Sequence, residues 1–129
     1  MQTFLPYPSF RVSAKLLDYK RLGKQRVEAR QILNALQKGG GWSHHPAVTM
    51  WRGYEEALTE YGNIMIEEWI RRGYQNNMEI IPVENPVMPH WLFGENFHAA
   101  HRSALLRKDR EWYSQWGWLE RDDLPYVWP

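Results

Sequence analysis

The chain has no cysteine among its 129 residues. The fold therefore contains no disulfide, and a metal site would have to be built from His, Asp or Glu. No stretch approaches the roughly 20 apolar residues that span a bilayer, and the first residues lack the charged start and apolar run of a signal peptide. Repeats, low-complexity tracts and Gly/Ser linkers are also absent. We expect one soluble cytoplasmic domain over residues 1–129, large enough to bury a hydrophobic core without disulfides or a structural metal.

The net charge of +1 conceals an uneven distribution along the chain. Residues 1–45 hold eight Lys and Arg against two Asp and Glu, whereas residues 46–95 hold three against eight. Such a basic N-terminal third is typical of a polyanion-binding protein, or of a solvated helix face whose charge is offset by the acidic middle segment. The chain is also rich in aromatic residues, and four of its eight Trp lie in the last 18 residues.

Apolar periodicity predicts an all-α fold. Three helices are expected, at about 13–38 with Ser13 as the N-cap, at 46–72 and at 96–108. The one β-like stretch, MEIIPV, is too short and too closely bounded by Pro to seed a sheet. We therefore predict a compact single domain of two long helices and one shorter helix. Extended N-terminal, connecting and C-terminal segments are expected to bind these helices together.

The stretch RLGKQRVEA, residues 21–29, surrounds a single carboxylate, Glu28, with basic side chains. On a helical wheel Arg21, Lys24, Gln25 and Glu28 share one polar face, which points away from the apolar stripe of the first helix. The bases suit phosphate, because charge neutralisation supplies much of nucleic-acid affinity. Two interpretations of Glu28 are open. It is either an ordinary salt bridge with Lys24, worth about a few tenths of a kcal/mol, or a chemical group that needs a second participant such as a nucleophile.

Three motifs together give the chain a resemblance to a known family. RLGKQRVE on the first expected helix, the second expected helix closing on EEWIRRGY, and the late HRSALLRKDREWYSQWG resemble the pyrimidine-dimer DNA glycosylases, the phage endonuclease V type and its small bacterial relatives. The resemblance covers nearly the whole chain in order. It implies an all-α domain that binds duplex DNA. Family members attack the sugar carbon of the damaged nucleotide with the N-terminal α-amine, form an imine, and break the strand by β-elimination.

Carried onto this sequence, the resemblance gives particular residues a role. It implies that Glu28 corresponds to the first-helix glutamate of the family and that Met1 supplies the amine. The residues expected to contact DNA on this basis are Arg21, Lys24 and Arg26 on the first helix, and Trp112 and Tyr113 near the C-terminus. Gln25 is expected to join them because it shares the polar face of that helix. The chemistry is coherent, because α-amines have a pKa of about 8 against about 10.4 for Lys and are partly neutral at pH 7. A carboxylate beneath the sugar stabilises the positive charge that develops there.

The second position departs from the phage pattern, in which removal of the initiator Met exposes a small residue. Here it is Gln, so Met1 is expected to stay. Either the Met1 amine is the nucleophile, or the protein is a monofunctional glycosylase that activates water against another modified DNA or RNA base. Lys24 is a weaker substitute, since it would need strong desolvation. A further alternative is a module that clamps nucleic acid without chemistry.

Basic and histidine side chains outside the first helix extend the expected DNA surface. SHHPA precedes the second expected helix, whose N-terminus favours an anion, although its histidines would equally cap that helix. The residues expected to face DNA from here and from the third helix are His44, His45, His101, Arg102 and Lys108. A metal site shared by His98 and His101 lacks a carboxylate pattern. We expect no metal or cofactor, and a monomer whose partner is duplex DNA with a damaged or modified base.

Overall fold

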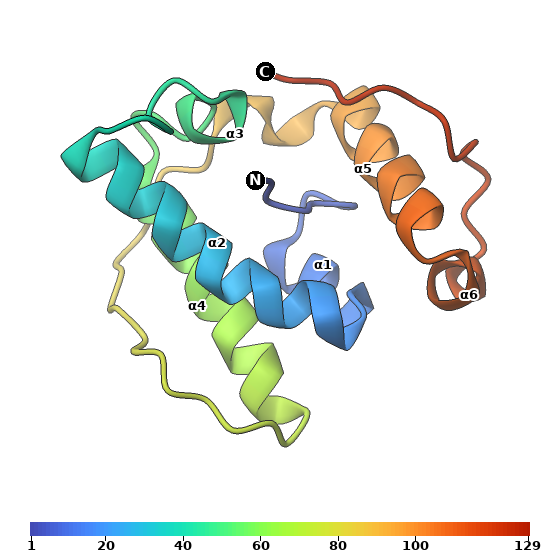
Figure 1. The fold of residues 1–129 in the computed structure, drawn as a ribbon, viewed down its shortest axis with the longest axis horizontal. Helices are drawn as coiled ribbons and strands as arrows, with labels where there is room; N and C mark the ends of the chain where they lie inside the picture. Colours follow the sequence, from blue (N-terminus) through green and yellow to red (C-terminus); the bar gives the residue numbers. More distant parts are fainter.

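The computed structural model describes residues 1–129 and is all-helical, which confirms the predicted fold class (Figure 1). No strand forms. The helices are α1 Phe10–Leu16, α2 Tyr19–Lys38, α3 Pro46–Thr49, α4 Glu55–Arg71, α5 Glu95–Lys108 and α6 Arg110–Tyr113, with short 3-10 turns η1 His90–Phe93 and η2 Ser114–Trp116. None of them combines the length and the apolar character needed to cross a bilayer.

The first expected helix is two helices, so the predicted start at Ser13 is wrong. Ser9 caps α1, its Oγ accepting from the Val12 N–H at 3.1 Å. The chain then turns extended at Leu17, and Asp18 caps α2. Two successive caps therefore override an apolar pattern that runs on through the break. Ser13 lies buried inside α1, where its hydroxyl exchanges hydrogen bonds with the Tyr7 backbone.

The second expected helix is also broken in two. A turn at residues 50–54 separates α3 from α4, and Gly53 within it adopts a φ of 86°, which glycine takes without strain. The turn carries Trp51 into the core, where its ring packs 6.0 Å from Tyr61 and 5.0 Å from Trp91 between centroids. The third expected helix is α5, which begins one residue earlier than predicted.

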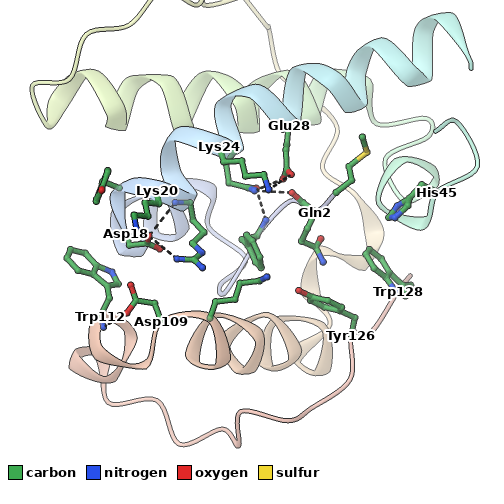
Figure 2. A pocket seen from close by; sticks show the side chains of 16 residues that line it. Gln2, Asp18, Lys20, Lys24, Glu28, His45, Asp109, Trp112, Tyr126 and Trp128 are labelled. Carbon is green, nitrogen blue, oxygen red and sulfur yellow. Dashed lines mark hydrogen bonds and ion pairs between the residues drawn. The ribbon is translucent and has the colours of Figure 1, made fainter. Parts of the chain in front are cut away.

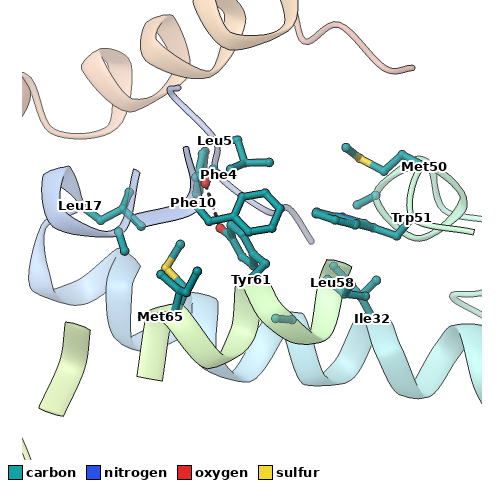
Figure 3. Packing of buried hydrophobic residues seen from close by; sticks show 14 of the residues in the cluster. Phe4, Leu5, Phe10, Leu17, Ile32, Met50, Trp51, Leu58, Tyr61 and Met65 are labelled. Atoms are coloured by element: carbon teal, nitrogen blue, oxygen red, sulfur yellow. Dashed lines mark hydrogen bonds between the residues drawn. The ribbon is translucent and has the colours of Figure 1, made fainter. Parts of the chain in front are cut away.

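Helices α2 and α4 pack side by side and carry much of the hydrophobic core (Figures 1 and 3). They approach closely at Gly62, where an added Cβ would lie 3.3 Å from the Ala29 Cβ, and at Gly23, where an added Cβ would lie 2.9 Å from Cζ3 of Trp69. The core cluster holds 26 buried residues, with Phe10, Tyr61 and Met65 near its centre. The N-terminal segment packs against this pair of helices.

The N-terminal residues 2–6 are buried between the α2/α4 pair and α5, and they form neither helix nor sheet (Figure 1). Their backbone groups therefore need side-chain partners. The Phe4 N–H donates to Oε1 of Gln25 at 2.9 Å, and the Phe4 carbonyl accepts from the Tyr61 hydroxyl at 2.8 Å (Figure 3). Side chains of α2 and α4 thus hold this segment on one side.

Helix α5 holds the same segment on the other side. The Leu5 N–H donates to Nδ1 of His101 at 2.9 Å, and the Leu5 carbonyl lies 2.7 Å from Nδ1 of His98. The guanidinium of Arg102 donates to the Pro6 carbonyl at 2.7 Å. All three side chains are buried. The N-terminal segment is therefore clamped from both sides, which fixes where Met1 leaves the core.

The C-terminal tail, residues 114–129, runs along the outside of α5 and ends beside α3 (Figure 1). Arg102 pairs with Glu120 at 3.0 Å, and the Leu124 N–H donates to the hydroxyl of Ser103 at 3.0 Å. These bonds return the tail to the side of the molecule where the N-terminus emerges.

Burial gives His101 a measurable pH signature. Burial, and to a lesser extent the neighbouring His98 side chain, lowers the pKa of His101 to about 3. In the unfolded chain a His has a pKa of about 6.5. Below that pH the unfolded chain therefore binds a proton at His101, whereas the folded chain does not. His101 therefore does not lower the free energy of unfolding above about pH 6.5. As the pH falls from there toward 3, protonation of His101 in the unfolded chain lowers the free energy of unfolding by about 1.4 kcal/mol per pH unit.

Urea unfolding at a series of pH values from 7 to 5 tests this expectation. His101→Asn should be less stable at pH 7, because packing is lost, but its stability should fall less steeply with acid than that of the wild type. The exposed His44→Asn variant is the control and should keep the wild-type slope. Parallel curves for wild type and His101→Asn would contradict the account.

Candidate active site

A cleft of about 960 Å³ opens between α2 and the arm formed by α5, α6 and the C-terminal tail (Figure 2). Its lining residues come from the N-terminal segment, α2 and its cap, the α3 cap, the end of α5, α6 and the tail. They are Met1, Gln2, Phe4, Asp18, Tyr19, Lys20, Arg21, Lys24, Gln25, Glu28, His45, Lys108, Asp109, Trp112, Tyr126 and Trp128. Segments far apart in the sequence therefore meet at one concave surface.

A second cleft of about 630 Å³ adjoins the first along the C-terminal half of α2. Its lining residues are Met1, Glu28, Gln31, Asn34, Ala35, Lys38, Gly39, Gly40, Gly41 and Trp42. Met1 and Glu28 are the two residues that line both clefts. Met1 and the one acid of the basic stretch therefore both border the junction of the two clefts.

Glu28 is buried, and its carboxylate is held by two neighbours on α2 (Figure 2). Nε2 of Gln25 donates to its Oε2 at 3.0 Å, and Nζ of Lys24 lies 3.7 Å from its Oε1. The helical wheel predicted that this polar face would point away from the core. The structure corrects that prediction for Gln25 and Glu28, because the N-terminal segment covers the face and buries both side chains. Lys24 keeps an exposed side chain.

Positive side chains line both walls of the first cleft. Lys20 and Lys24 come from α2, and Lys108 comes from the end of α5 on the opposite wall. Arg21 also lines the cleft, although its guanidinium is paired with Asp18 at 3.3 Å. Cations on facing walls suit a polyanion lying along the cleft. Lys20 was missed from sequence, and its spacing of four from Lys24 on one helix is the signal that could have found it.

Aromatic side chains flank the cleft at its two ends (Figure 2). Trp112 is fixed at one end by a hydrogen bond of 2.8 Å from its Nε1 to the Leu16 carbonyl. Trp128 lies at the other end, 6.1 Å from the His45 ring between centroids. His45 caps α3, its Nδ1 accepting from the Ala47 N–H at 3.0 Å. Trp128 and its neighbour Tyr126 are not among the residues predicted to contact DNA, because no periodicity relates the tail to α2.

Two of the residues predicted to contact DNA lie away from the cleft. Arg26 is on the opposite face of α2, with its guanidinium 4.2 Å from the centroid of the Trp69 ring and 2.8 Å from Oδ1 of Asn76. Partial burial lowers the pKa of Arg26. His44 is exposed but lines neither cleft.

The structure also corrects the expected positions of His101, Arg102 and Tyr113, which are buried. His101 and Arg102 hold the N-terminal segment, and Arg102 is further paired with Glu95 and Glu120. The Tyr113 hydroxyl donates to the carboxylate of Asp18, the cap of α2. The three side chains are buried, so none of them presents a surface to a duplex.

No cluster of three or more His, Asp and Glu side chains has the arrangement needed to hold a metal ion. The polar groups of the two clefts are amines, a guanidinium, carboxylates, amides and an imidazole. Acid–base and nucleophilic chemistry are within the reach of such a set.

Comparison with known proteins adds one finding. A family model described as pyrimidine dimer DNA glycosylase matches residues 1–82, which is more than half of the chain. The matched part contains α1 to α4 and both residues shared by the two clefts, and the cleft residues on α5, α6 and the tail lie outside it. No curated protein and no solved structure gives a significant match.

Proposed function

The chain belongs to the pyrimidine dimer DNA glycosylase family, and we propose that it both excises a damaged pyrimidine from duplex DNA and cleaves the strand. The α-amine of Met1 is the proposed nucleophile and Glu28 the carboxylate that assists it. The observation that carries the proposal is the junction of the two clefts, which is lined on both sides by these two residues.

The first chemical step joins the enzyme to the sugar. The amine nitrogen bonds to C1′ as the glycosidic bond breaks, and the base leaves with the bonding electrons and takes up a proton from water. The nitrogen, positively charged once bonded, gives a proton to Glu28, which can then pass it to O4′. Positive charge develops on the sugar as this happens, and a carboxylate held beneath it stabilises that charge. Glu28 suits this role because the Gln25 N–H and the Lys24 ammonium hold it as an oriented anion.

The second step breaks the strand. The C1′–O4′ bond opens with proton transfer to O4′, which leaves an imine between C1′ and the Met1 nitrogen. Removal of a C2′ proton then expels the phosphate from C3′, and water hydrolyses the imine to release the enzyme. Glu28 is the proposed carrier of both protons, since general acid–base transfer needs a carboxyl within hydrogen-bond reach of the reacting atoms.

The DNA is proposed to lie along the first cleft, bound by a single copy of the chain without a cofactor. Lys20 and Lys24 on one wall and Lys108 on the other would neutralise phosphates. Trp112 and Trp128 at the two ends would stack on bases unstacked around the lesion. The proposed interface leaves out Arg26, whose guanidinium lies over Trp69.

Glu28→Gln tests the role of the acid. The amide keeps the shape and still accepts from Gln25, but it neither carries a negative charge nor moves protons. Single-turnover excision on a duplex with a cyclobutane dimer should fall by about 100-fold or more, whereas the Kd for that duplex stays within about threefold. Glu56→Gln, an exposed change on α4, is the matched control. Wild-type excision by Glu28→Gln would refute the mechanism.

Lys108→Ala tests the path of the DNA. Loss of one phosphate contact should weaken binding several-fold and reduce the slope of log Kd against log salt concentration by about one. Fluorescence anisotropy at a series of salt concentrations measures both quantities. Lys15→Ala removes an exposed lysine of α1 that lines neither cleft, so its slope should match the wild type. Equal slopes for both variants would remove Lys108 from the interface.

A further inference from the structure

Gln25 is a buried amide, 1% exposed, that lies between Glu28 and the N-terminal segment. Its Nε2 donates to Oε2 of Glu28 and to the Gln2 carbonyl, at 3.0 Å in each case. Its Oε1 accepts from the Phe4 N–H at 2.9 Å and lies 2.6 Å from the Tyr61 hydroxyl, whose single proton it shares with the Phe4 carbonyl. Both amide protons are therefore used, and the amide oxygen faces two donors.

These four partners permit one orientation of the amide. A flipped side chain would set its NH₂ group against the Phe4 N–H and its oxygen against the carboxylate of Glu28. Tyr61 reinforces the arrangement, because burial raises its pKa well above the usual value, the charge of Glu28 raises it further, and the hydroxyl stays a donor. The Gln25 side chain thus has one orientation, and its hydrogen bonds restrain the Glu28 carboxylate and the backbone of Gln2 and Phe4.

The two acceptors of the Gln25 Nε2, Gln2 and Glu28, belong to the two halves of the proposed reaction centre. Gln2 is one peptide bond from Met1, so the bond to its carbonyl restrains the base of the nucleophile. The bond to Glu28 orients the carboxylate. We propose that Gln25 is a positioning residue that holds the Met1 amine and the Glu28 carboxylate in register, an inference that rests on the function proposed above.

The role is a demanding one, because a displacement of about 1 Å between reacting groups can cost on the order of 100-fold in rate. Glutamate has nearly the shape of glutamine but lacks both donors. In Gln25→Glu an oxygen takes the place of Nε2, which lies 3.0 Å from Oε2 of Glu28. Two carboxylates that share a site hold a proton to higher pH than either does alone. A purely structural change would not produce that effect.

The test is the pH profile of single-turnover excision by Gln25→Glu on the dimer duplex. We expect the acidic limb to move to higher pH by at least about one unit, with the rate at pH 7 lowered about tenfold or more and the duplex Kd within about threefold. Gln37→Glu makes the same change at an exposed position of α2 that lines neither cleft, and it should keep the wild-type limb. A Gln25→Glu limb that coincides with the wild type overturns the inference.

Thermal unfolding of each variant shows whether it folds. If Gln25→Glu does not, Gln25→Met carries the test, because it removes the donor to Glu28 without adding charge and should move the limb in the same direction. An unmoved limb again overturns the inference. The Glu28→Gln result separates the two proposals. An inactive Glu28→Gln with an unmoved Gln25→Glu limb overturns only the positioning role, whereas an active Glu28→Gln overturns the proposed function and this inference with it.

Discussion

A buried stretch of backbone outside any helix or sheet must find hydrogen-bond partners among side chains, and the N-terminal segment of this protein obeys that requirement. Gln25 and Tyr61 satisfy Phe4, His98 and His101 satisfy Leu5, and Arg102 satisfies Pro6. The same requirement explains why these polar side chains are buried. Because these hydrogen bonds fix the N-terminal segment, Met1 has a defined position at the border of the same clefts as Glu28.

The basic stretch around Glu28 keeps its single acid for a related reason. A buried carboxylate is costly unless it is hydrogen-bonded or paired, and Glu28 has an amide donor from Gln25 and an ammonium nearby on Lys24. Lys20 and Arg21 line the open cleft, whereas Arg26 lies on the opposite face of α2 over Trp69. One face of α2 thus serves two purposes: its buried rows orient the acid, and its exposed rows offer charge to a polyanion. The family to which the chain belongs, pyrimidine dimer DNA glycosylase, gives this arrangement a DNA substrate.

The local sequence pattern predicted those features that depend on residues close together in the chain. Periodicity gave the all-α class, and the spacing of Lys24 and Glu28 placed them in contact as observed. It missed the helix breaks, because the apolar pattern continues across Leu17 and Trp51 while caps and a glycine turn end the helices. It also misplaced His101, whose burial depends on docking a segment 96 residues away along the chain. Arg26 is different: at about 100° per residue it lies about 200° from Glu28, so the wheel alone already excluded it from that face.

The central claim is that the Met1 amine bonds to the sugar, and borohydride trapping tests it most directly. Reduction during turnover on a duplex carrying a cyclobutane thymine dimer, followed by mass spectrometry of the adducted peptide, identifies the nitrogen. We predict an adduct on the α-amine of Met1, and its loss when that amine is blocked by acetylation. Binding without any adduct, on the dimer duplex and on an abasic duplex, would contradict the account and favour activated water or a module that only binds. An adduct on Lys24 would equally contradict it.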